Sequence, residues 1–484
     1  MEKFKEYDRN TPYLIPPSVE EWLPAGHLAY FVVDIVERLD LTEIKKCYSY
    51  SGSKAYAPEV LIGLLFYGYI TGVYSSRKIE TATYESLAFR HIAANQHPDH
   101  DTIANFRAKY LKQLKDVFLQ ILVIAGEMGV KKIGKVSLDG TKIKANASKH
   151  KALSWAYANK LEEQLKEEIA QLIRKGQEAD SDNRNDGMKV PEEIAIRQKR
   201  LTAIDAAKEK IKARAKERYD NQLKEYEEKV KNRAAKEQAT GKKAKGKKPV
   251  APSPEPIAKD QVNLTDEESR IMPISGGGFG QCYNAQACVD IESMLIVTNH
   301  LTIHTNDKKE ITPTLDTIKK LPKDIADIKD LLADTGYHSK ENVQSVISCG
   351  INPLIAEKRD KHHPSPEERF REPDPLAEGA SAAELASWRL KTQEGKKLYA
   401  KRKSTIEPVF GIIKHVMGFR QFSLRGEEKV AGEWNLVTIA WNIKRLHKIC
   451  NLLSQEAHII KQLSQNTIII LQAFFKTMGF REIF

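Results

Sequence analysis

The sequence predicts an α/β protein with an N-terminal all-helical domain and a long charged helical insertion. Three observations lead to this fold class. Residues 13–127 carry helical apolar periodicity, strand-like runs begin at residue 135 and return at residue 283, and residues 151–239 between them are rich in Lys and Glu. Apolar residues three and four apart line one face of a helix, whereas alternation marks a half-buried strand. A chain of 484 residues has room for several domains.

The composition favours a basic cytoplasmic protein. Lys and Arg number 77 against 65 for Asp and Glu, so the net charge is +12, which favours a polyanionic partner such as nucleic acid. The five cysteines include no CxxC pair and are typical of reduced thiols in a cytosolic protein. The charged N-terminus lacks the apolar core of a signal peptide, and the apolar stretch 467–475 is too short to span a bilayer. We therefore expect no membrane partner.

Residues 1–130 are expected to form a helical DNA-binding domain. A helix over residues 58–71 starts with proline and is followed by glycine, which are typical start and stop residues. The next helix carries Arg77 and Lys78 near its start. Two helices joined by a glycine turn would place Arg77 and Lys78 in a major groove. An ordinary helical bundle with solvated basic residues explains the same pattern, and the sequence leaves both interpretations open.

The strands and helices on either side of the insertion follow an α/β order. Alternating or apolar runs predict strands, and periodic runs predict helices. In chain order the sequence predicts strand 135–145, strand 283–290, strand 294–297 after a hairpin turn, helix 311–321, strand 328–333, helix 341–348, strand 351–355, a loop over 364–386 and helices from 395 to 450. This is the order of a ribonuclease-H-like catalytic domain, formed by residues 131–150 and 263–450, with residues 451–484 as a C-terminal helical tail.

Residues 151–262 are expected to be a peripheral insertion. Apolar residues recur at helical spacing among Lys and Glu, which predicts a helical hairpin whose turn lies at residues 180–187. The Lys/Pro-rich end, residues 241–256, is expected to be disordered. Its lysines could touch phosphate or belong to a solvated linker. Such an arm could pair with a second subunit or lie along DNA, and the sequence does not decide between them.

Three acidic residues stand where a two-metal site would need them. Asp139 ends the strand-like run 135–139, Asp334 ends the apolar run 328–334, and Glu407 lies near the start of an amphipathic helix. Mg²⁺ prefers oxygen ligands and keeps positions open for phosphate and water. Each acid also has an ordinary explanation: a tight Asp-Gly turn for Asp139, a helix cap for Asp334 and dipole compensation for Glu407. The three together predict the metal ligands of a catalytic site.

Four sequence blocks resemble the DDE transposases of bacterial insertion sequences. The blocks cover residues 138–150, 283–286, 333–337 and 402–414. The resemblance implies a ribonuclease-H-like catalytic domain, Mg²⁺ as cofactor with Mn²⁺ as a substitute, and double-stranded DNA as partner, namely terminal inverted repeats and target DNA. It also implies a homodimer or larger assembly in a synaptic complex, located with the bacterial nucleoid.

The function that the resemblance implies is binding of the inverted repeats followed by Mg²⁺-dependent DNA strand cleavage and strand transfer. One alternative is a DNA-binding protein that descends from a transposase and has no catalytic activity. Another is a metal-dependent nuclease that cuts DNA without joining it. Since one two-metal site can use either water or a 3′-hydroxyl as the attacking group, the sequence does not separate cutting from joining.

The last block departs from the Tyr-x2-Arg-x3-Glu-x6-Lys signature of one branch of this family. Glu407 and Lys414 have the signature spacing, whereas Arg402 and the tyrosine before it lie one residue early. Lys403 stands at the Arg position. In a continuous helix, Lys403 would share a face with Glu407 and Arg402 would point elsewhere. A helix that began after Arg402 would leave Arg402 free to turn in.

Three further polar residues have open roles. Lys414 either contacts phosphate as a point charge or is an exposed helix lysine. Asn284 and Gln286 share one face of the strand 283–290, because side chains two apart point the same way. They either steady the site or touch DNA.

Overall fold

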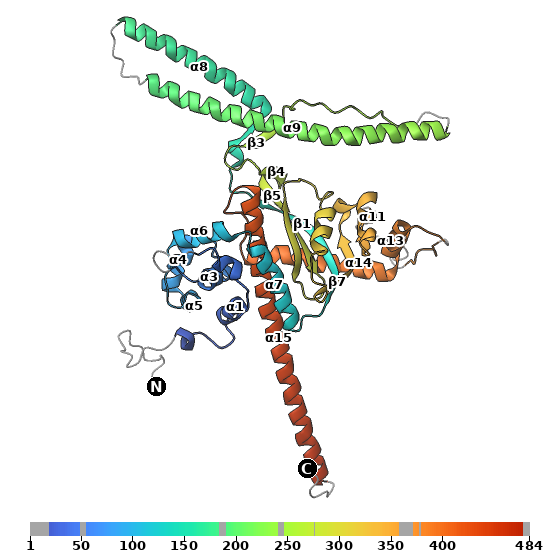
Figure 1. Cartoon of the computed structure of the whole chain (residues 1–484). Helices are drawn as coiled ribbons and strands as arrows, with labels where there is room; N and C mark the ends of the chain where they lie inside the picture. The colour runs from blue at the N-terminus through green and yellow to red at the C-terminus, as the bar shows by residue number, and fades with distance from the viewer. Residues whose placement is uncertain are drawn as a thin grey trace, which may run out of the picture. The chain divides into compact units, whose positions relative to one another are not determined.

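The computed structural model describes residues 19–48, 55–182, 190–240, 246–274, 276–357, 371–376 and 379–477 (Figure 1). The chain divides into two compact units, one formed by residues 1–143 and 284–484 and the other by residues 144–283. The second unit contains the expected insertion and extends beyond it at both ends. The helices of the N-terminal region and the strands that carry the acids belong to the same unit.

The first unit begins with short helices. They are η1 (Val19–Trp22), a 3₁₀ turn, and α1 (Leu28–Glu37), α2 (Thr42–Lys45), α3 (Pro58–Thr71), α4 (Ser76–Glu85), α5 (Leu87–Ile92), α6 (His100–Tyr110) and α7 (Leu114–Glu127). The predicted helix α3 starts at Pro58 and is closed by Gly72, whose φ of 84° favours glycine. Nearly all residues of α3 are buried, and it packs against α1 and α5. A helix that is apolar on all sides is a core helix, so α3 is the centre of this helical region.

The sheet of the first unit is mixed. Its strands are β1 (Ile133–Lys144), β5 (Phe279–Asp290), β6 (Ile296–Thr302), β7 (Ala326–Ala333) and β8 (Asn352–Ile355), and their order is β6-β5-β1-β7-β8. Strands β1, β7 and β8 run parallel, whereas β5 and β6 are antiparallel to each other. A further strand, β4 (Arg270–Pro273), pairs with the first residues of β5, which belong to the second unit. The predicted strands are present, and β1 lies between β5 and β7.

Helices connect and follow the strands. They are α10 (Ile311–Ile318), the 3₁₀ turn η3 (Thr335–Tyr337), α11 (Lys340–Ser348), α13 (Ala382–Lys391), α14 (Gln393–Gly411), the π-helical turn η4 (Ile412–Val416) and α15 (Glu427–Thr477). The prediction of a loop over 364–386 is wrong at its end, because Ser381 and Glu384 form a capping box that starts α13. Residues 358–370 and 377–378 lie outside the described part of that loop. Helix α15 runs without a break past residue 450.

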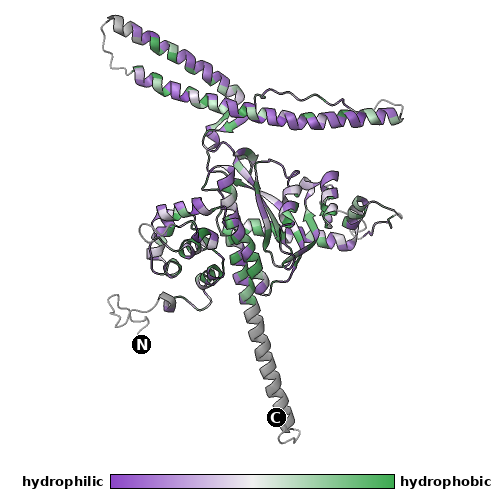
Figure 2. Cartoon of the chain, viewed as in Figure 1, coloured by the Kyte–Doolittle hydropathy of each residue, from purple (hydrophilic) through white to green (hydrophobic). Residues whose placement is uncertain are grey.

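The second unit is built on two long helices, α8 (Trp155–Asp182) and α9 (Val190–Thr240). Next to them lie the 3₁₀ turn η2 (Lys149–Lys151) and the antiparallel pair of β2 (Ala152–Ser154) and β3 (Gln261–Asn263). The two helices contact each other, as expected for a hairpin. Residues 180–182 of the expected turn belong to α8, and residues 183–187 lie outside the described residues. Figure 2 shows both helices hydrophilic along most of their length.

The apolar core of the second unit is confined to part of the helix pair. It contains the predicted residues Leu161 and Leu165 of α8 and Ile204 and Ile211 of α9, and it also includes Leu153, Ala158, Ala207 and Val262. Farther along, Ile173 is 46% exposed. There the contact between the helices is polar: the guanidinium of Arg197 on α9 lies 2.9 Å from the carboxylate of Glu168 on α8. The thin apolar stripe seen in the sequence therefore packs only part of α8 and α9.

The described part of the Lys/Pro-rich segment is irregular and contacts α9. Residues 246–258 have little regular secondary structure, but Arg233 of α9 donates hydrogen bonds to the carbonyls of Gly246 (3.3 Å) and Lys247 (3.1 Å). Arg218 of α9 donates to the carbonyl of Glu255 at 3.4 Å. A proline-rich segment leaves its carbonyls without partners of its own, and long arginine side chains on α9 supply donors.

A buried carboxylate ties the N-terminal helices to α15. Glu433 is fully buried on α15, and it accepts hydrogen bonds from the backbone N–H groups of Ser423 (2.9 Å) and Leu424 (3.0 Å). The hydroxyl of Tyr69 on α3 also donates to it at 3.1 Å, and Arg107 on α6 donates to the Tyr69 oxygen at 3.2 Å. Burial raises the pKa of Glu433. The group is stable there because donors from several elements converge on it.

We predict that Glu433→Ala lowers the free energy of unfolding by about 3 kcal/mol, because it leaves several buried donors without an acceptor and the buried charge of Arg107 without a nearby opposite charge. Urea unfolding followed by tryptophan fluorescence measures this change. Glu428→Ala is the control on the same helix: its side chain is 73% exposed, and its ion pair with the exposed Lys112 is expected to contribute little to stability. Equal effects of the two substitutions would contradict the role given to Glu433.

Candidate active site

The pairing of β1 with β7 places Asp139 and Asp334 at the same level of the sheet. The two strands are parallel, and their last paired residues are Leu138 and Ala333. The residue that follows Leu138 is Asp139, and the residue that follows Ala333 is Asp334. Asp139 does not end its strand, because β1 continues to Lys144, so the explanation of a tight Asp-Gly hairpin turn is wrong. Asp334 does follow the end of β7.

Each aspartate is oriented by a backbone N–H group. The N–H of Gly140 donates to Asp139 Oδ1 at 2.8 Å, and the N–H of Gly336 donates to Asp334 Oδ1 at 2.8 Å. Asp334 thereby caps η3, as one of its alternative explanations proposed. Capping and ligation do not exclude each other, because a carboxylate has a second oxygen that can bind another group.

Asp139 is a largely buried acid with negative neighbours. Its pKa is raised to about 6, first by burial and also by the charges of Asp334 and Asp307. The Gly140 N–H and the guanidinium of Arg402 act in the opposite direction. The Coulomb interaction also shows that Asp334 lies close enough to Asp139 for the two charges to repel. This part of the site has more negative than positive charge.

Arg402 connects Asp139 to Glu407. Its guanidinium lies 3.2 Å from Asp139 Oδ2 and 3.5 Å from Glu407 Oε1. The Arg402 side chain is only 11% exposed, whereas that of Glu407 is 53% exposed. Lys403 is exposed. Of the two candidates for the Arg position, Arg402 is the one that faces the acids.

The prediction that Arg402 points elsewhere in a continuous helix is wrong. Helix α14 runs unbroken from Gln393 to Gly411. Residues five apart, such as Arg402 and Glu407, project about 140° apart around a helix axis. The long side chain of Arg402 nevertheless reaches Asp139 on β1 and Glu407 on its own helix. Helical phase was a poor guide because an arginine carries its charge several bonds from the backbone.

Lys414 also turns toward β1. It lies in η4, where the N–H of Met417 donates to the carbonyl of Ile412 at 2.8 Å, which is the spacing of a π-helical turn. The ammonium of Lys414 donates to the carbonyl of Lys142 at 3.2 Å, three residues beyond Asp139. Lys414 is half-buried. The explanation of a fully exposed helix lysine does not fit this position.

Sequence reasoning missed Asp307, a fourth acid beside the pair. Asp307 Oδ1 accepts hydrogen bonds from the amides of Asn284 (2.7 Å) and Gln286 (2.7 Å), and the ammonium of Lys142 lies 3.2 Å away. Asn284 and Gln286 are fully buried, so steadying the site fits them better than touching DNA. Asp307 follows β6 in an irregular segment, where neither periodicity nor a motif singles it out.

The acids fit a divalent cation in charge and ligand type, with one difference from the prediction. Asp139 and Asp334 offer hard oxygen ligands beside a surplus of negative charge, which suits Mg²⁺. Glu407 contacts Arg402 instead. Among the residues that the structure describes, no three His, Cys, Asp or Glu side chains lie close enough together to hold a metal ion. Joining Glu407 to the pair therefore requires Arg402 to move.

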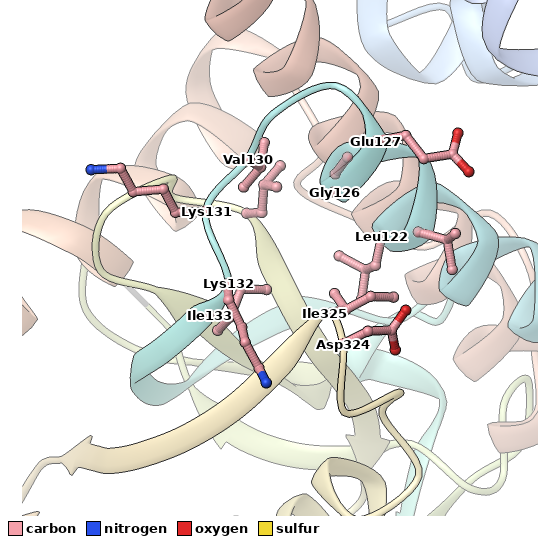
Figure 3. A pocket seen from close by; sticks show the side chains of 12 residues that line it. Leu122, Gly126, Glu127, Val130, Lys131, Lys132, Ile133, Asp324 and Ile325 are labelled. Carbon is pink, nitrogen blue, oxygen red and sulfur yellow. The ribbon is translucent and has the colours of Figure 1, made fainter.

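A cavity of about 270 Å³ lies elsewhere in this unit (Figure 3). It is lined by the end of α7 and by residues 130–133, together with Leu295, Asp324 and Ile325. Ile133 stands six residues before Asp139 on β1, roughly 20 Å along a strand. None of the candidate site residues lines this cavity.

The predicted DNA-contacting residues Arg77 and Lys78 lie on α4, and both are exposed. Ser75 precedes this helix at the N-cap position without a side-chain capping bond. Contact with DNA and an ordinary helical bundle with solvated basic residues both require these side chains to be exposed. Within the described residues, no helix is both long and apolar enough to cross a membrane.

A mixed α/β unit with paired acids on adjacent parallel strands fits the DDE class of DNA-processing enzymes. Two family models match the chain: Transposase domain (DUF772) over residues 17–109 and Transposase DDE domain over residues 258–443. The chain is a DDE transposase of the insertion-sequence type. No curated protein and no solved structure matches it.

The two matches cover most of the candidate residues. Arg77 and Lys78 fall in the first, and Asp334, Glu407 and the two basic residues of the last block fall in the second. Asp139 lies before the second match in the sequence, and the long helices α8 and α9 separate the two. Its assignment therefore rests on the pairing of β1 with β7.

We predict that Asp139→Asn stabilises the folded chain when no divalent cation is bound. The pKa of Asp139 is raised from 3.8 to about 6, so the folded chain binds this proton more tightly than the unfolded chain. The free energy of unfolding therefore falls as pH rises from about 4 to about 6, by about 1–2 kcal/mol in total for a partly exposed group. Asn avoids this loss.

Urea unfolding in the presence of EDTA tests the effect of Asp139→Asn. Near-equal stabilities at pH 4 and a more stable variant at pH 8 are expected. Asp101→Asn is the matched control, because the Asp101 side chain is 82% exposed. A variant that gains no stability at pH 8, or gains as much at pH 4, would show that the charge of Asp139 is not destabilising.

Proposed function

We propose that this transposase binds the terminal inverted repeats of an insertion sequence and catalyses Mg²⁺-dependent DNA strand cleavage and strand transfer. Asp139, Asp334 and Glu407 are the proposed metal ligands. The observation that carries the proposal is the pairing of Leu138 with Ala333, which brings two acids far apart in sequence to one level of the sheet. Arg402 links the third acid to this pair.

The proposed chemistry needs few protein groups. When bound, Mg²⁺, or Mn²⁺ in its place, activates the attacking oxygen and stabilises the leaving oxygen of an in-line displacement. In cleavage, the water loses a proton as its oxygen forms the new P–O bond, the bond from phosphorus to the 3′ oxygen breaks, and the 3′ oxygen gains a proton. In strand transfer, the freed 3′-hydroxyl loses its proton and attacks a phosphodiester of the target, whose own 3′ oxygen leaves.

The side chains of this chain orient that reaction. Gly140 holds Asp139 Oδ1 by its N–H. Oδ2, which contacts the guanidinium of Arg402, is the oxygen proposed to bind a cation once Arg402 moves. Arg402 is the proposed Arg of the Tyr-Arg-Glu-Lys signature, a role supported by its burial and its contact with two acids. Lys414, which reaches β1, is proposed to contact a phosphate as a point charge.

The remaining parts have proposed partners. The N-terminal helical region contacts the inverted repeats through Arg77 and Lys78, and two or more copies hold paired ends in a synaptic complex. The helices α8 and α9 form an arm outside the catalytic site. A protein that acts on the chromosome in this way works in the cytoplasm, at the bacterial nucleoid.

One observation favours a second candidate function. Arg402 lies between Asp139 and Glu407. A transposase-derived DNA-binding protein in which Arg402 never leaves this place would bind element ends without cutting them. A nuclease without strand transfer would cut but not join. An assay with labelled element ends and a supercoiled target separates the three, because only a transposase gives joined products.

We predict that Asp139→Asn, Asp334→Asn and Glu407→Gln each lower Mg²⁺-dependent nicking of element ends by at least about 100-fold, because each removes a ligand charge without changing shape. Binding of the same DNA in gel shifts is expected to stay within about threefold. Asp101→Asn, an exposed acid on α6, is the control and keeps full activity. Nicking retained by any one of the three variants removes that residue from the site.

We predict that Arg77→Ala combined with Lys78→Ala weakens binding to element ends and lowers the slope of log affinity against log salt by about 2, because each substitution removes one cation from a DNA phosphate. Gel shifts between low and physiological salt measure the slope. The control is Lys131→Ala combined with Lys132→Ala, an adjacent exposed basic pair beside the cavity of Figure 3. If the two double variants had equal effects, Arg77 and Lys78 would contribute no more to DNA binding than any other exposed basic pair.

A further inference from the structure

Gln286 is a fully buried amide on β5 whose two ends have different partners. Its Oε1 accepts a hydrogen bond from the hydroxyl of Tyr337 at 2.5 Å. Its Nε2 donates to Asp307 Oδ1 at 2.7 Å and to Asn284 Oδ1 at 3.0 Å. An amide supplies one acceptor and two donors on the same group, which is what these partners require.

The acceptor end of Gln286 reaches the turn that follows Asp334. Tyr337 is the last residue of η3, the turn that Asp334 caps through the N–H of Gly336. The Tyr337 ring is fully buried, so its hydroxyl has few other ways to be satisfied. The bond from Tyr337 to Gln286 thereby fixes the far end of the turn that orients Asp334.

The donor end of Gln286 packs against the backbone that follows Asp139. A Cβ atom at Gly140 would lie 2.1 Å from Gln286 Nε2 and 2.8 Å from Asp307 Oδ1. Residue 140 must therefore be glycine for β1 to approach the amide this closely. Gly140 also supplies the N–H that orients Asp139. Gln286 thus contacts the segment after each of the two acids.

The strand that carries Gln286 is itself held. The backbone carbonyl of Gln286 accepts a hydrogen bond from the indole N–H of Trp434 at 3.0 Å, and Trp434 is a fully buried residue of α15. Gln286 also pairs with His300 of β6. A side chain on such a fixed backbone can define a distance between two other segments.

We propose that Gln286 is a positioning residue of the active site, which sets the placement of Asp139 relative to Asp334 for a divalent cation. This inference rests on the proposed function for the identity of the ligands. Gln286 does not touch the cation or the DNA. Its amide holds Gly140 and Tyr337, and these in turn hold the two aspartates.

Binding of Mn²⁺ to the full-length protein, followed by the loss of the free-ion EPR signal, tests the proposal without relying on activity. Gln286→Met keeps the volume but removes all three side-chain hydrogen bonds, and we expect it to weaken Mn²⁺ binding by about 10–100-fold. Tyr337→Phe removes only the bond to Oε1, and a smaller loss in the same direction is expected. The double variant is expected to lose less Mn²⁺ affinity than the product of the two single fold-losses, because both substitutions remove the same hydrogen bond.

The control variant is Asn442→Ala. Asn442 is another fully buried amide of this unit, which binds the backbone of Ile296 through both ends. It is expected to lose stability and to keep the Mn²⁺ affinity of the wild type. If Gln286→Met does not fold, Tyr337→Phe alone tests the role of Gln286. It removes a single oxygen and keeps the ring, so this variant is expected to fold.

The outcomes separate the inference from the proposed function. Unchanged Mn²⁺ affinity in a folded Gln286→Met or Tyr337→Phe protein overturns the role of Gln286, whatever the nicking activity. No measurable Mn²⁺ binding by the wild type overturns it as well. Weakened binding in these variants, together with a wild type that binds Mn²⁺ but never nicks element ends, supports the positioning role and contradicts the proposed function instead.

Discussion

The pairing of β1 with β7 is the constraint on which the site depends. Parallel strands in fixed register bring residues from distant parts of the chain to one level, and here the residues after Leu138 and Ala333 are both aspartates. A shift of one residue would turn one of them to the opposite face of the sheet. The apolar residues of β1 and β7 that pack in the core therefore also fix the geometry of the acids.

The charges at this level are only partly balanced. Asp139, Asp334 and Asp307 are close enough for two of them to raise the pKa of the third, while Arg402 offsets part of the repulsion. Such a site is destabilising when empty and gains stability when it binds a cation, because the repulsion is then relieved. The amide of Gln286 and the N–H groups of Gly140 and Gly336 keep the carboxylates from turning away.

The sequence allowed much of this to be predicted, and the failures have physical reasons. Asp139 and Asp334 could be singled out because each follows an apolar run in the sequence. Their side-by-side position could not, because register is set by packing between segments almost 200 residues apart. Arg402 was misplaced by helical phase, since the reach of a long side chain is not encoded in residue spacing. Asp307 lies in an irregular segment and gave no signal. Carbonyls in the described part of the Lys/Pro-rich segment accept hydrogen bonds from arginines on α9, which composition alone does not reveal.

The central claim is that one cation site is formed by three distant segments of the chain, at Asp139, Asp334 and Glu407. The most direct measurement replaces Mg²⁺ with Fe²⁺ and uses ascorbate and peroxide to generate hydroxyl radicals at the bound ion, which cut the backbone nearby. The account predicts cuts close to residues 139, 334 and 407, all suppressed by excess Mg²⁺ and by Asp139→Asn. Cuts at only one of these segments, or cuts that persist unchanged in Asp139→Asn, would contradict it.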